Sequence, residues 1–215
     1  MATEKSPEDV AEMIPDGATF MVGGFLAVGT PERIMDALVR KKKTDPTIIA
    51  NDTAYPNVGI GKLISAGLVR KVLASHIGTN SETQAQVEQG RIDLTLVPQG
   101  TLIEQIRAGG AGLGGVLTPT GVGTVVAEGK KVIQIKSREY LLEEPITADF
   151  ALIHARWGDK AGNLIFEGTM RNFSPLLATA ANVVCAQVDE YLEDDFLDPN
   201  HVHVPGIFVD HIIRS

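Results

Sequence analysis

Short apolar segments alternate with helix-like segments through the first half of the chain, and this alternation constrains the fold more than any other feature of the sequence. The strand-like segments lie at 19–22, 47–51, 69–75 and 92–97, and helical patterns follow them at 30–43, 58–67, 80–89 and 100–107. Parallel strands need a helical crossover between them, and strands buried on both faces form continuous apolar runs. We therefore predict an α/β fold with a Rossmann-like, mostly parallel sheet and helices on both faces.

The pattern changes in the second half of the chain, where a glycine-rich loop is expected over 109–123. Further strands are predicted at 132–135, 140–142, 148–155 and 181–188, the first two as a hairpin. A helix is expected to begin at 172–175. The sequence contains no internal repeat, low-complexity tract or linker, and a single domain over 1–215 is expected.

Composition and charge exclude several classes of protein. The chain has 215 residues, 44% of them hydrophobic, and a net charge of −8, which argues against a nucleic-acid binder with a basic face. No apolar run approaches the ~20 residues of a membrane span, and MATEKSPEDV has no apolar signal region. The only cysteine, Cys185, lies in a strand-like run and is expected to be a buried core thiol. We expect a cytoplasmic protein without membrane or nucleic-acid partners.

Polar or glycine-rich segments follow all four strands of the first half. These strand ends are Gly23-Gly24-Phe25, Asn51-Asp52-Thr53, Ser75-His76 and Pro98-Gln99-Gly100-Thr101. Turn and cap chemistry can explain each of them separately. In an open α/β sheet, however, the carboxyl ends of parallel strands meet at one edge, where ligands bind. The four together favour a shared ligand cleft.

Familiar catalytic and metal motifs are missing from the sequence. GAGLGG (110–115) has the spacing of a dinucleotide fingerprint but follows a helix instead of a strand, which argues against NAD. His201 and His203 have no supporting ligands at metal-site spacing, so a strand surface is expected there and no metal site. Glu104 and Glu167 lie near suggestive loops but have no visible base or orienting partner. The residues alone indicate a ligand-binding α/β domain without a nucleophile.

The segment 16–31, DGATFMVGGFLAVGTP, closely resembles the signature of the family I CoA-transferases: D-G, an apolar run, G-G-F and G-x-P. The resemblance extends over essentially the whole chain. Its other segments are similar to the α subunit of acetate/butyrate–acetoacetate CoA-transferases: NDTA (51–54), SHIGTN (75–80), VPQGTLIEQIRAGGAGLGG (97–115), LTPTGVGT (117–124) and MRNF (170–173).

The resemblance implies an enzyme whose nucleophile lies on another polypeptide. The family transfers CoA by a ping-pong reaction through a glutamate that becomes an enzyme–CoA thioester, and this glutamate lies in an S-E-N-G context on the β subunit. This chain has only Ser81-Glu82-Thr83, in a helix-start setting. The resemblance thus implies no catalytic residue here, a β subunit in an α2β2 assembly, and coenzyme A or acyl-CoA as substrate with no permanently bound cofactor. The alternative is a sugar-phosphate-binding isomerase or sensor domain of the same fold.

The resemblance also places CoA against the loop from Gly24 to Thr30. Its residues are Gly24, Phe25, Leu26, Ala27, Val28, Gly29 and Thr30. Gly23 and Gly24 are expected to give clearance for the pantetheine arm, and free N–H groups at the start of the next helix would suit amide or phosphate oxygens. Asn51 and Gln99, at adjacent strand ends, are predicted to shape the acyl pocket.

The loop over 109–123 contains seven glycines in fifteen residues. Glycines at this density are costly in chain entropy unless close backbone approach compensates. The interleaved apolar residues are Leu113, Val116, Leu117 and Val122, and a partner surface could cover them. The loop is therefore expected near the α/β contact or the cleft it encloses; the alternative is a loop folded onto its own domain.

Overall fold

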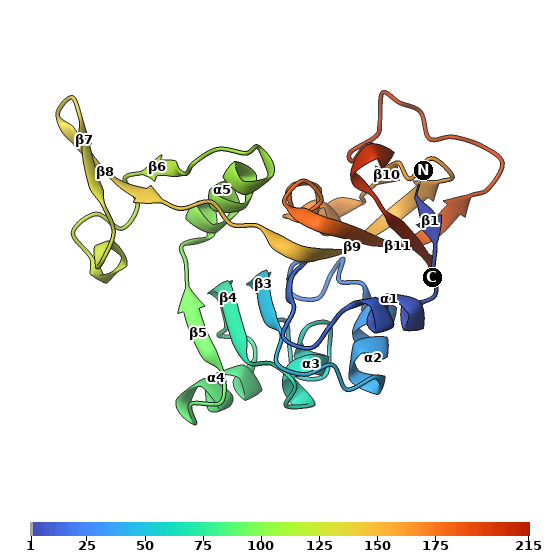
Figure 1. Ribbon diagram of the computed structural model, residues 1–215, viewed down its shortest axis with the longest axis horizontal. Coiled ribbons are helices and arrows are strands. Elements are labelled where there is room, and N and C mark those ends of the chain that lie inside the picture. The colour runs from blue at the N-terminus through green and yellow to red at the C-terminus, as the bar shows by residue number, and fades with distance from the viewer. Residues whose placement is uncertain (1) are drawn as a thin grey trace.

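The computed structural model describes residues 2–215 and is built on one large sheet (Figure 1). Its strands are β1 (Thr3–Glu4), β2 (Thr19–Val22), β3 (Thr47–Asp52), β4 (Lys71–His76), β5 (Asp93–Leu96), β9 (Ala148–Asp159), β10 (Leu164–Ile165), β11 (Ala181–Leu192) and β12 (His211–Arg214). They run in the order β1-β12-β11-β9-β2-β3-β4-β5, with β10 beside β9. Only the β10 pairing is antiparallel. The predicted mostly parallel sheet is confirmed.

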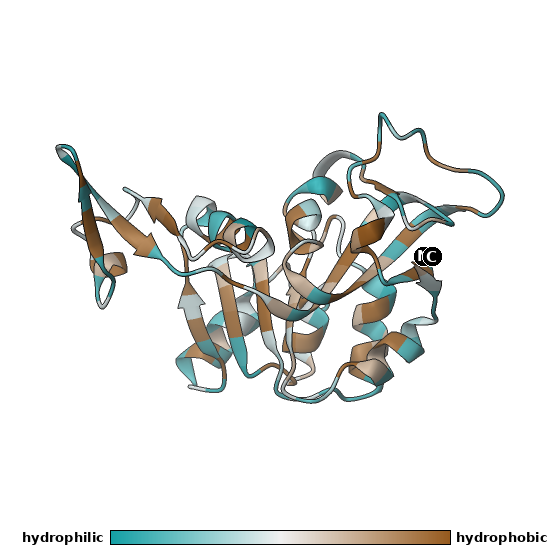
Figure 2. Cartoon of the chain, turned by 45° about the horizontal axis from the view of Figure 1, so that its top comes forward, coloured by the Kyte–Doolittle hydropathy of each residue, from teal (hydrophilic) through white to brown (hydrophobic). Residues whose placement is uncertain are grey.

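Helices cover both faces of this sheet. They are α1 (Pro7–Met13), α2 (Glu32–Arg40), α3 (Gly61–Ser65), α4 (Ser81–Glu88), α5 (Gln99–Gly110) and α6 (Ser174–Leu177). Side chains alternate along each strand, so that Phe20 packs in the core with α1 to α3, and Met21 packs in the second core with α5 and α6. Figure 2 shows the hydrophobic residues concentrated in the strands between these helices. Two apolar cores therefore hold the carboxyl edge of the sheet rigidly.

Three further strands form a separate antiparallel sheet. They are β6 (Val116–Thr118), β7 (Val132–Ile135) and β8 (Arg138–Glu143), in the order β6-β8-β7. This small sheet projects from one end of the molecule (Figure 1). The predicted hairpin is confirmed, but the loop over 109–123 is partly wrong, because its first two glycines end α5 and 116–118 form β6.

The glycines of this segment serve contacts inside the chain. A Cβ on Gly109 would lie 2.1 Å from the carbonyl oxygen of Ile146, and one on Gly110 would lie 2.3 Å from Oγ1 of Thr179. A Cβ on Gly115 would lie 2.6 Å from the carbonyl oxygen of Glu143. The close backbone approach expected from the glycines exists at these positions, but the approaching backbone is the chain's own.

Cys185 lies in β11 and is fully buried, as predicted. Burial in an apolar surrounding raises the pKa of its thiol to about 12, with the nearby Asp210 carboxylate adding to the effect. The thiolate is the reactive form of cysteine, and this side chain is almost entirely protonated at neutral pH. Cys185 is therefore a core residue and not a nucleophile.

Candidate functional site

The four strand ends meet at a cavity of about 380 Å³ on the carboxyl edge of the sheet. We call it the strand-end cavity, and its lining residues are Phe25, Leu26, Asn51, Ser75, His76, Thr79 and Gln99. These residues come from the last residues of β3 and β4 and from the segments that follow β2, β4 and β5. The expected shared cleft is confirmed as a geometric feature, and the lining combines apolar side chains with amides and hydroxyls.

The loop after β2 folds into a tight turn over 25–28. The amide of Phe25 donates to the carbonyl of Val28 at 3.0 Å, and the amide of Val28 donates to the carbonyl of Phe25 at 2.9 Å. The two central residues have positive φ, Leu26 at 48° and Ala27 at 72°, as in a type I′ turn. Non-glycine residues in this region cost of order 1–3 kcal/mol each and persist where surrounding structure holds them, often at ligand sites.

Asp52 is the residue that holds this turn in place. Its carboxylate is 4% exposed, and Oδ2 accepts a hydrogen bond from the amide of Leu26 at 3.1 Å. Its Oδ1 accepts from the amide of Ala54 at 2.7 Å. Asp52 thus joins the end of β3 to the turn beyond β2. From the sequence, Asp52 was predicted only as part of a polar strand end. A carboxylate directly after a buried apolar run was the one sequence signal that could have indicated its anchoring role.

We predict that Asp52→Asn loosens the 25–28 turn. The amide side chain keeps one acceptor oxygen, so one of the two backbone donors loses its partner, at a cost of about 1–3 kcal/mol. Hydrogen exchange at the Leu26 amide should become roughly 5- to 150-fold faster as a result. Asp16→Asn is the matched control, because Asp16 accepts from the amide of Thr44 at 2.9 Å outside the turn. Unchanged exchange at Leu26 in Asp52→Asn would contradict the anchoring role.

The glycines of the loop are required by the loop itself. Gly24 has φ of +99°, and a Cβ there would lie 2.8 Å from both the Thr30 nitrogen and the Val28 oxygen. Gly29 has φ of +81°, and a Cβ there would lie 2.5 Å from Cα of Met170. A Cβ on Gly23 would lie 2.5 Å from Oγ of Ser174. A side chain at any of these positions would meet atoms of the chain itself, so the packing of the loop already requires the glycines.

Amide groups at the start of α2 are also engaged within the chain. The Thr30 amide donates to the carbonyl of Ala27 at 3.1 Å, and its hydroxyl donates to the carbonyl of Gly23 at 3.3 Å. Pro31 has no N–H, and the Arg33 amide donates to the side chain of Gln187 at 3.1 Å. Thr30, Pro31 and Arg33 therefore offer no free N–H group to phosphate oxygens.

Asn51 and Gln99, the two residues predicted for the acyl pocket, are hydrogen-bonded to each other. Nε2 of Gln99 donates to Oδ1 of Asn51 at 2.9 Å, and the Ser75 hydroxyl lies 2.9 Å from the same oxygen. Asn51 is 1% exposed, whereas Gln99 is exposed at the start of α5. Asn51 therefore orients Gln99, whose second amide hydrogen and Oε1 have no hydrogen-bond partner among residues 2–215.

His76 and Thr79 also line the cavity, although neither was among the predicted site residues. His76 ends β4, and the Thr79 hydroxyl donates to the carbonyl of Ala54 at 2.8 Å. His76 is the one titratable side chain among the lining residues, which include no carboxylate, cysteine or lysine. Both hydroxyls of the lining already donate hydrogen bonds within the chain, that of Ser75 to Asn51 and that of Thr79 to Ala54, and no carboxylate or thiol is available for covalent attack.

The acidic candidates have structural partners elsewhere. Glu82 lies in the first turn of α4, where its carboxylate accepts from the Ser65 hydroxyl, and Asn80 caps the helix. The Glu104 carboxylate pairs with Arg107 at 2.9 Å, and Glu167 lies 3.7 Å from Arg156. None of the three acids lines the strand-end cavity. The view of Ser81-Glu82-Thr83 as a helix start is confirmed.

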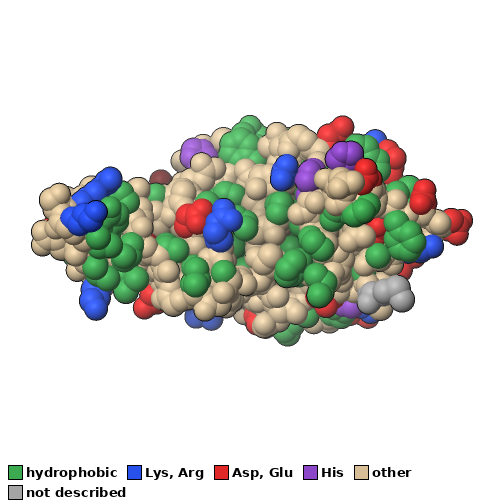
Figure 3. All heavy atoms as spheres, turned by 90° about the horizontal axis from the view of Figure 1, so that it is seen from above, with side chains coloured by type: hydrophobic (Ala, Val, Ile, Leu, Met, Phe, Trp, Pro, Cys, Tyr) green, Lys and Arg blue, Asp and Glu red, His purple; other side chains and the backbone are tan. Residues whose placement is uncertain are grey.

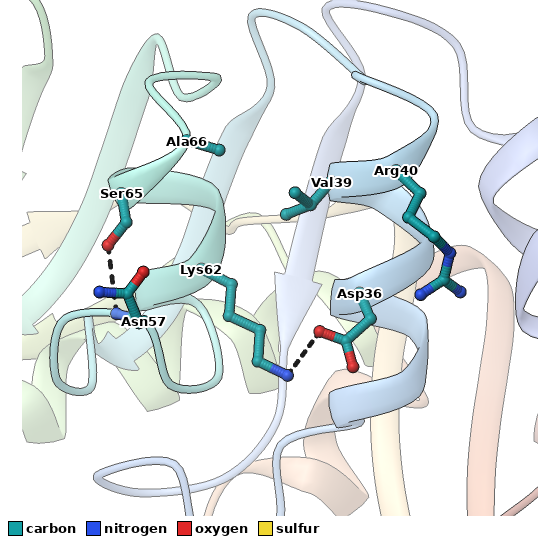
Figure 4. A pocket seen from close by; sticks show the side chains of 7 residues that line it. All are labelled: Asp36, Val39, Arg40, Asn57, Lys62, Ser65 and Ala66. Atoms are coloured by element: carbon teal, nitrogen blue, oxygen red, sulfur yellow. Dashed lines mark hydrogen bonds and ion pairs between the residues drawn. The ribbon is translucent and has the colours of Figure 1, made fainter.

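A second cavity, of about 440 Å³, lies between α2 and α3 (Figure 4). Lys62 crosses it and forms ion pairs with Asp36 at 2.6 Å and with Glu32 at 2.5 Å. Partial burial opposes the charged form, but the hydrogen bonds to both carboxylates outweigh it and raise the pKa of Lys62. A lysine held in the ammonium form cannot act as a base or nucleophile at neutral pH, so this group joins two helices structurally.

The expected strand surface at His201 and His203 is wrong. Both histidines lie in the irregular connection between β11 and β12. The amide of Phe166 donates to Nδ1 of His203 at 3.0 Å, and burial lowers the pKa of His203, with the Arg171 charge contributing.

Over residues 2–215 no three His, Cys, Asp or Glu side chains are grouped as metal ligands would be. No helix in the same range is long and apolar enough to cross a membrane.

Residues 3–215 match the model of the Coenzyme A transferase family, and the chain belongs to this family. It is 53% identical over 208 residues to the acetate CoA-transferase subunit alpha of Escherichia coli K12, covering 97% of this chain and 94% of that protein. It is 46% identical over 208 residues to the acetoacetyl-CoA:acetate/butyrate CoA transferase alpha subunit of Clostridium acetobutylicum, covering 97% and 95%.

A similar solved structure is the apoenzyme of an acyl-CoA transferase from Escherichia coli O157:H7, with a TM-score of 0.89 and 27% identity. The alignment covers 100% of this chain and 47% of that one, so the chain spans about half the length of the solved protein. A thioester complex of that transferase with CoA has a TM-score of 0.87 at the same identity and coverage. These relatives support the CoA-transferase interpretation and give no support to the sugar-phosphate alternative.

Proposed function

We propose that this chain is the α subunit of a heteromeric short-chain acyl-CoA:carboxylate CoA-transferase that acts on acetoacetate with acetyl- or butyryl-CoA. The observation that carries the proposal is the strand-end cavity, whose lining includes the amide side chains of Asn51 and Gln99 but no carboxylate or thiol. Such a half-site suits a chain whose relatives are named as alpha subunits. The second half of the site would come from a β subunit in an α2β2 assembly. We also propose a cytoplasmic location.

In the proposed reaction, a glutamate carboxylate of the β subunit attacks the carbonyl carbon of acyl-CoA. Negative charge develops on the thioester oxygen, and amide donors already in position stabilise it without reorganisation. The second amide hydrogen of Gln99, whose orientation depends on Asn51, is suited to this role. The carbon–sulfur bond breaks, so that CoA leaves as a thiolate and an acyl–glutamyl anhydride remains. The thiolate then attacks the glutamyl carbonyl carbon, which releases the acyl group as a free carboxylate and leaves CoA as a thioester of the glutamate. A second carboxylate reverses these two steps and accepts CoA.

The 25–28 turn would contact the CoA substrate through Phe25 and Leu26, which line the cavity. Ala27, Val28 and the flanking Gly24, Gly29 and Thr30 would act mainly by keeping this turn in its strained conformation. We further propose that residues 1–215 fold as one domain. The pairing of β1 with β12, which joins the two ends of the chain in one sheet, supports this view.

The test uses this chain reconstituted with its partner subunit, the CoA-transferase polypeptide that carries the nucleophilic glutamate. With acetoacetyl-CoA and acetate or butyrate, we expect ping-pong kinetics, seen as parallel lines in double-reciprocal plots. Mass spectrometry after incubation with acyl-CoA alone should show CoA on the partner subunit and none on this chain. CoA attached to this chain, or no transfer with any of these acids, would refute the proposal.

A further inference from the structure

Strand register in the small sheet places five large apolar side chains on one face. Leu117 pairs with Leu142, and Ile133 pairs with Tyr140. Ile135 lies two residues beyond Ile133 on β7, on the same face. The side chains of two directly paired residues point to the same face of a sheet, and so do the side chains of every second residue along one strand. We call these residues, Leu117, Ile133, Ile135, Tyr140 and Leu142, the apolar sheet face.

The chain covers the opposite face of this sheet along β8, although Val132 on β7 is 48% exposed there, and it leaves the apolar sheet face half-buried to exposed. Leu141 points to the opposite face and is fully buried, with Gly121 and Val126 of the 119–131 connection packed nearby. On the apolar sheet face, by contrast, Leu117 is 39% exposed and Ile135 is 44% exposed. A small three-stranded sheet is stabilised by burying an apolar face, so a second apolar face that stays partly exposed indicates a contact surface.

Uncompensated positive charge borders the apolar sheet face. Lys131, Lys136 and Arg138 are exposed at its edge, and none of them forms an ion pair with any residue in the range 2–215. The Arg138 guanidinium lies over the Tyr140 ring at 5.6 Å, on the apolar side of the sheet. In Figure 3, apolar side chains gather with basic ones at the narrow end of the molecule. Over 116–144 four basic and four acidic residues balance, but the acidic residues of β8, Glu139 and Glu143, point to the opposite face of the sheet.

A cavity of about 510 Å³ continues the surface toward the main body of the molecule. Leu142 lines it together with Gln105 of α5 and Glu143 of β8. Nε2 of Gln105 donates to Glu143 at 3.2 Å, but the buried Oε1 of Gln105 has no partner among the described residues. This cavity lies beside the apolar sheet face and contains a hydrogen-bond acceptor without a donor. A side chain of another polypeptide could therefore insert into the cavity and donate a hydrogen bond to Gln105.

We propose that the apolar sheet face is the docking surface for the β subunit, and that the docked surface of that subunit is apolar with carboxylates at its border. The inference rests on the proposed function for the existence of this partner. A second copy of the same chain fits less well, because a two-fold contact brings the same patch against itself. Lys131, Lys136 and Arg138 would then face each other's charges, because the carboxylates of β8, Glu139 and Glu143, point to the opposite face of the sheet.

Two variants test the docking surface in the full chain mixed with the β subunit, with affinity measured by surface plasmon resonance. Ile135→Glu places a carboxylate in the apolar contact and should weaken binding at least thirtyfold. Lys136→Glu reverses a border charge in an exposed turn; it should weaken binding roughly tenfold and flatten its salt dependence. Ile207→Glu is the matched control, because Ile207 is 89% exposed in the connection to β12 and outside the small sheet.

Wild-type affinity in both Ile135→Glu and Lys136→Glu would overturn the inference, as would failure of the wild-type chain to bind the β subunit. Dimers of this chain alone that Ile135→Glu dissociates would point to a second copy instead. Thermal unfolding of each isolated variant monitors folding. If the wild-type complex forms, transfers no CoA and is lost in Ile135→Glu, the proposed function fails and the docking surface stands.

Discussion

The purified chain alone should transfer no CoA between acetoacetyl-CoA and acetate, and adding its β subunit should raise the rate by roughly 10⁴-fold or more, as expected when a covalent nucleophile is supplied. The physical reason is the content of the strand-end cavity, whose lining includes amides, hydroxyls and His76 but no carboxylate or thiol. The measurement is the initial rate at fixed chain concentration while the β subunit is titrated, with saturation at a fixed ratio.

Two controls separate a missing nucleophile from a misfolded chain. Circular dichroism and a cooperative thermal transition should show that the isolated chain is folded. A β subunit whose nucleophilic glutamate is replaced by alanine should bind the chain and restore no activity. Robust turnover by the isolated chain, retained after further purification, would contradict the division of the site between two polypeptides.

Gly24→Val should lower kcat/KM of the reconstituted enzyme for acyl-CoA by roughly 100-fold or more. Valine at φ of +99° is strained by of order 1–3 kcal/mol. Its Cβ would also lie 2.8 Å from the Thr30 nitrogen and from the Val28 oxygen, so the turn must move to accept it. Movement of the turn displaces Phe25 and Leu26, which line the cavity. Steady-state kinetics against acyl-CoA concentration measure the effect.

Gly17→Val is the matched control for this change. Gly17 has φ of +76°, and a Cβ there meets no atom within 4 Å. Both variants should therefore lose stability to backbone strain, seen as a lower denaturant midpoint, but only Gly24→Val should lose activity. Wild-type kcat/KM in Gly24→Val would show that the turn does not contact the substrate, whereas equal loss of activity in both variants would indicate a general effect of strain.

Some features of the candidate site were predictable because parallel topology constrains them. Once β2 to β5 are identified as parallel strands, their carboxyl ends must lie at one edge. Asn51 and Gln99 each follow one of those strands, and they are found within hydrogen-bonding distance. His76 was equally placed in the sequence, at the end of β4. Without the strand order, no local pattern shows which strand-end side chains face a common cavity and which act as caps.

The meaning of the glycines could not be inferred correctly from their spacing. Gly109 and Gly110 indicated close backbone approach, and they make it, but to Ile146 and Thr179 of the same chain. Gly24 likewise accommodates the backbone near Thr30 and not a ligand. A glycine shows that space or positive φ is needed at its position. It does not show what fills the space, because that depends on segments distant in the sequence.

The sequence by itself determined the strands β2 to β5, the order of helices between them and the edge where polar groups collect, since these follow from local periodicity and from the rule that parallel strands share a direction. The short strands β1, β6, β10 and β12 were not predicted, because segments of two to four residues show little periodicity. Only the tertiary structure decided that Asp52 holds the strained turn at Leu26 and that one face of the β6-β8-β7 sheet stays uncovered. Both features depend on contacts between segments that lie far apart in the chain. Such contacts are set by packing, and they leave no periodic pattern in the residues that form them.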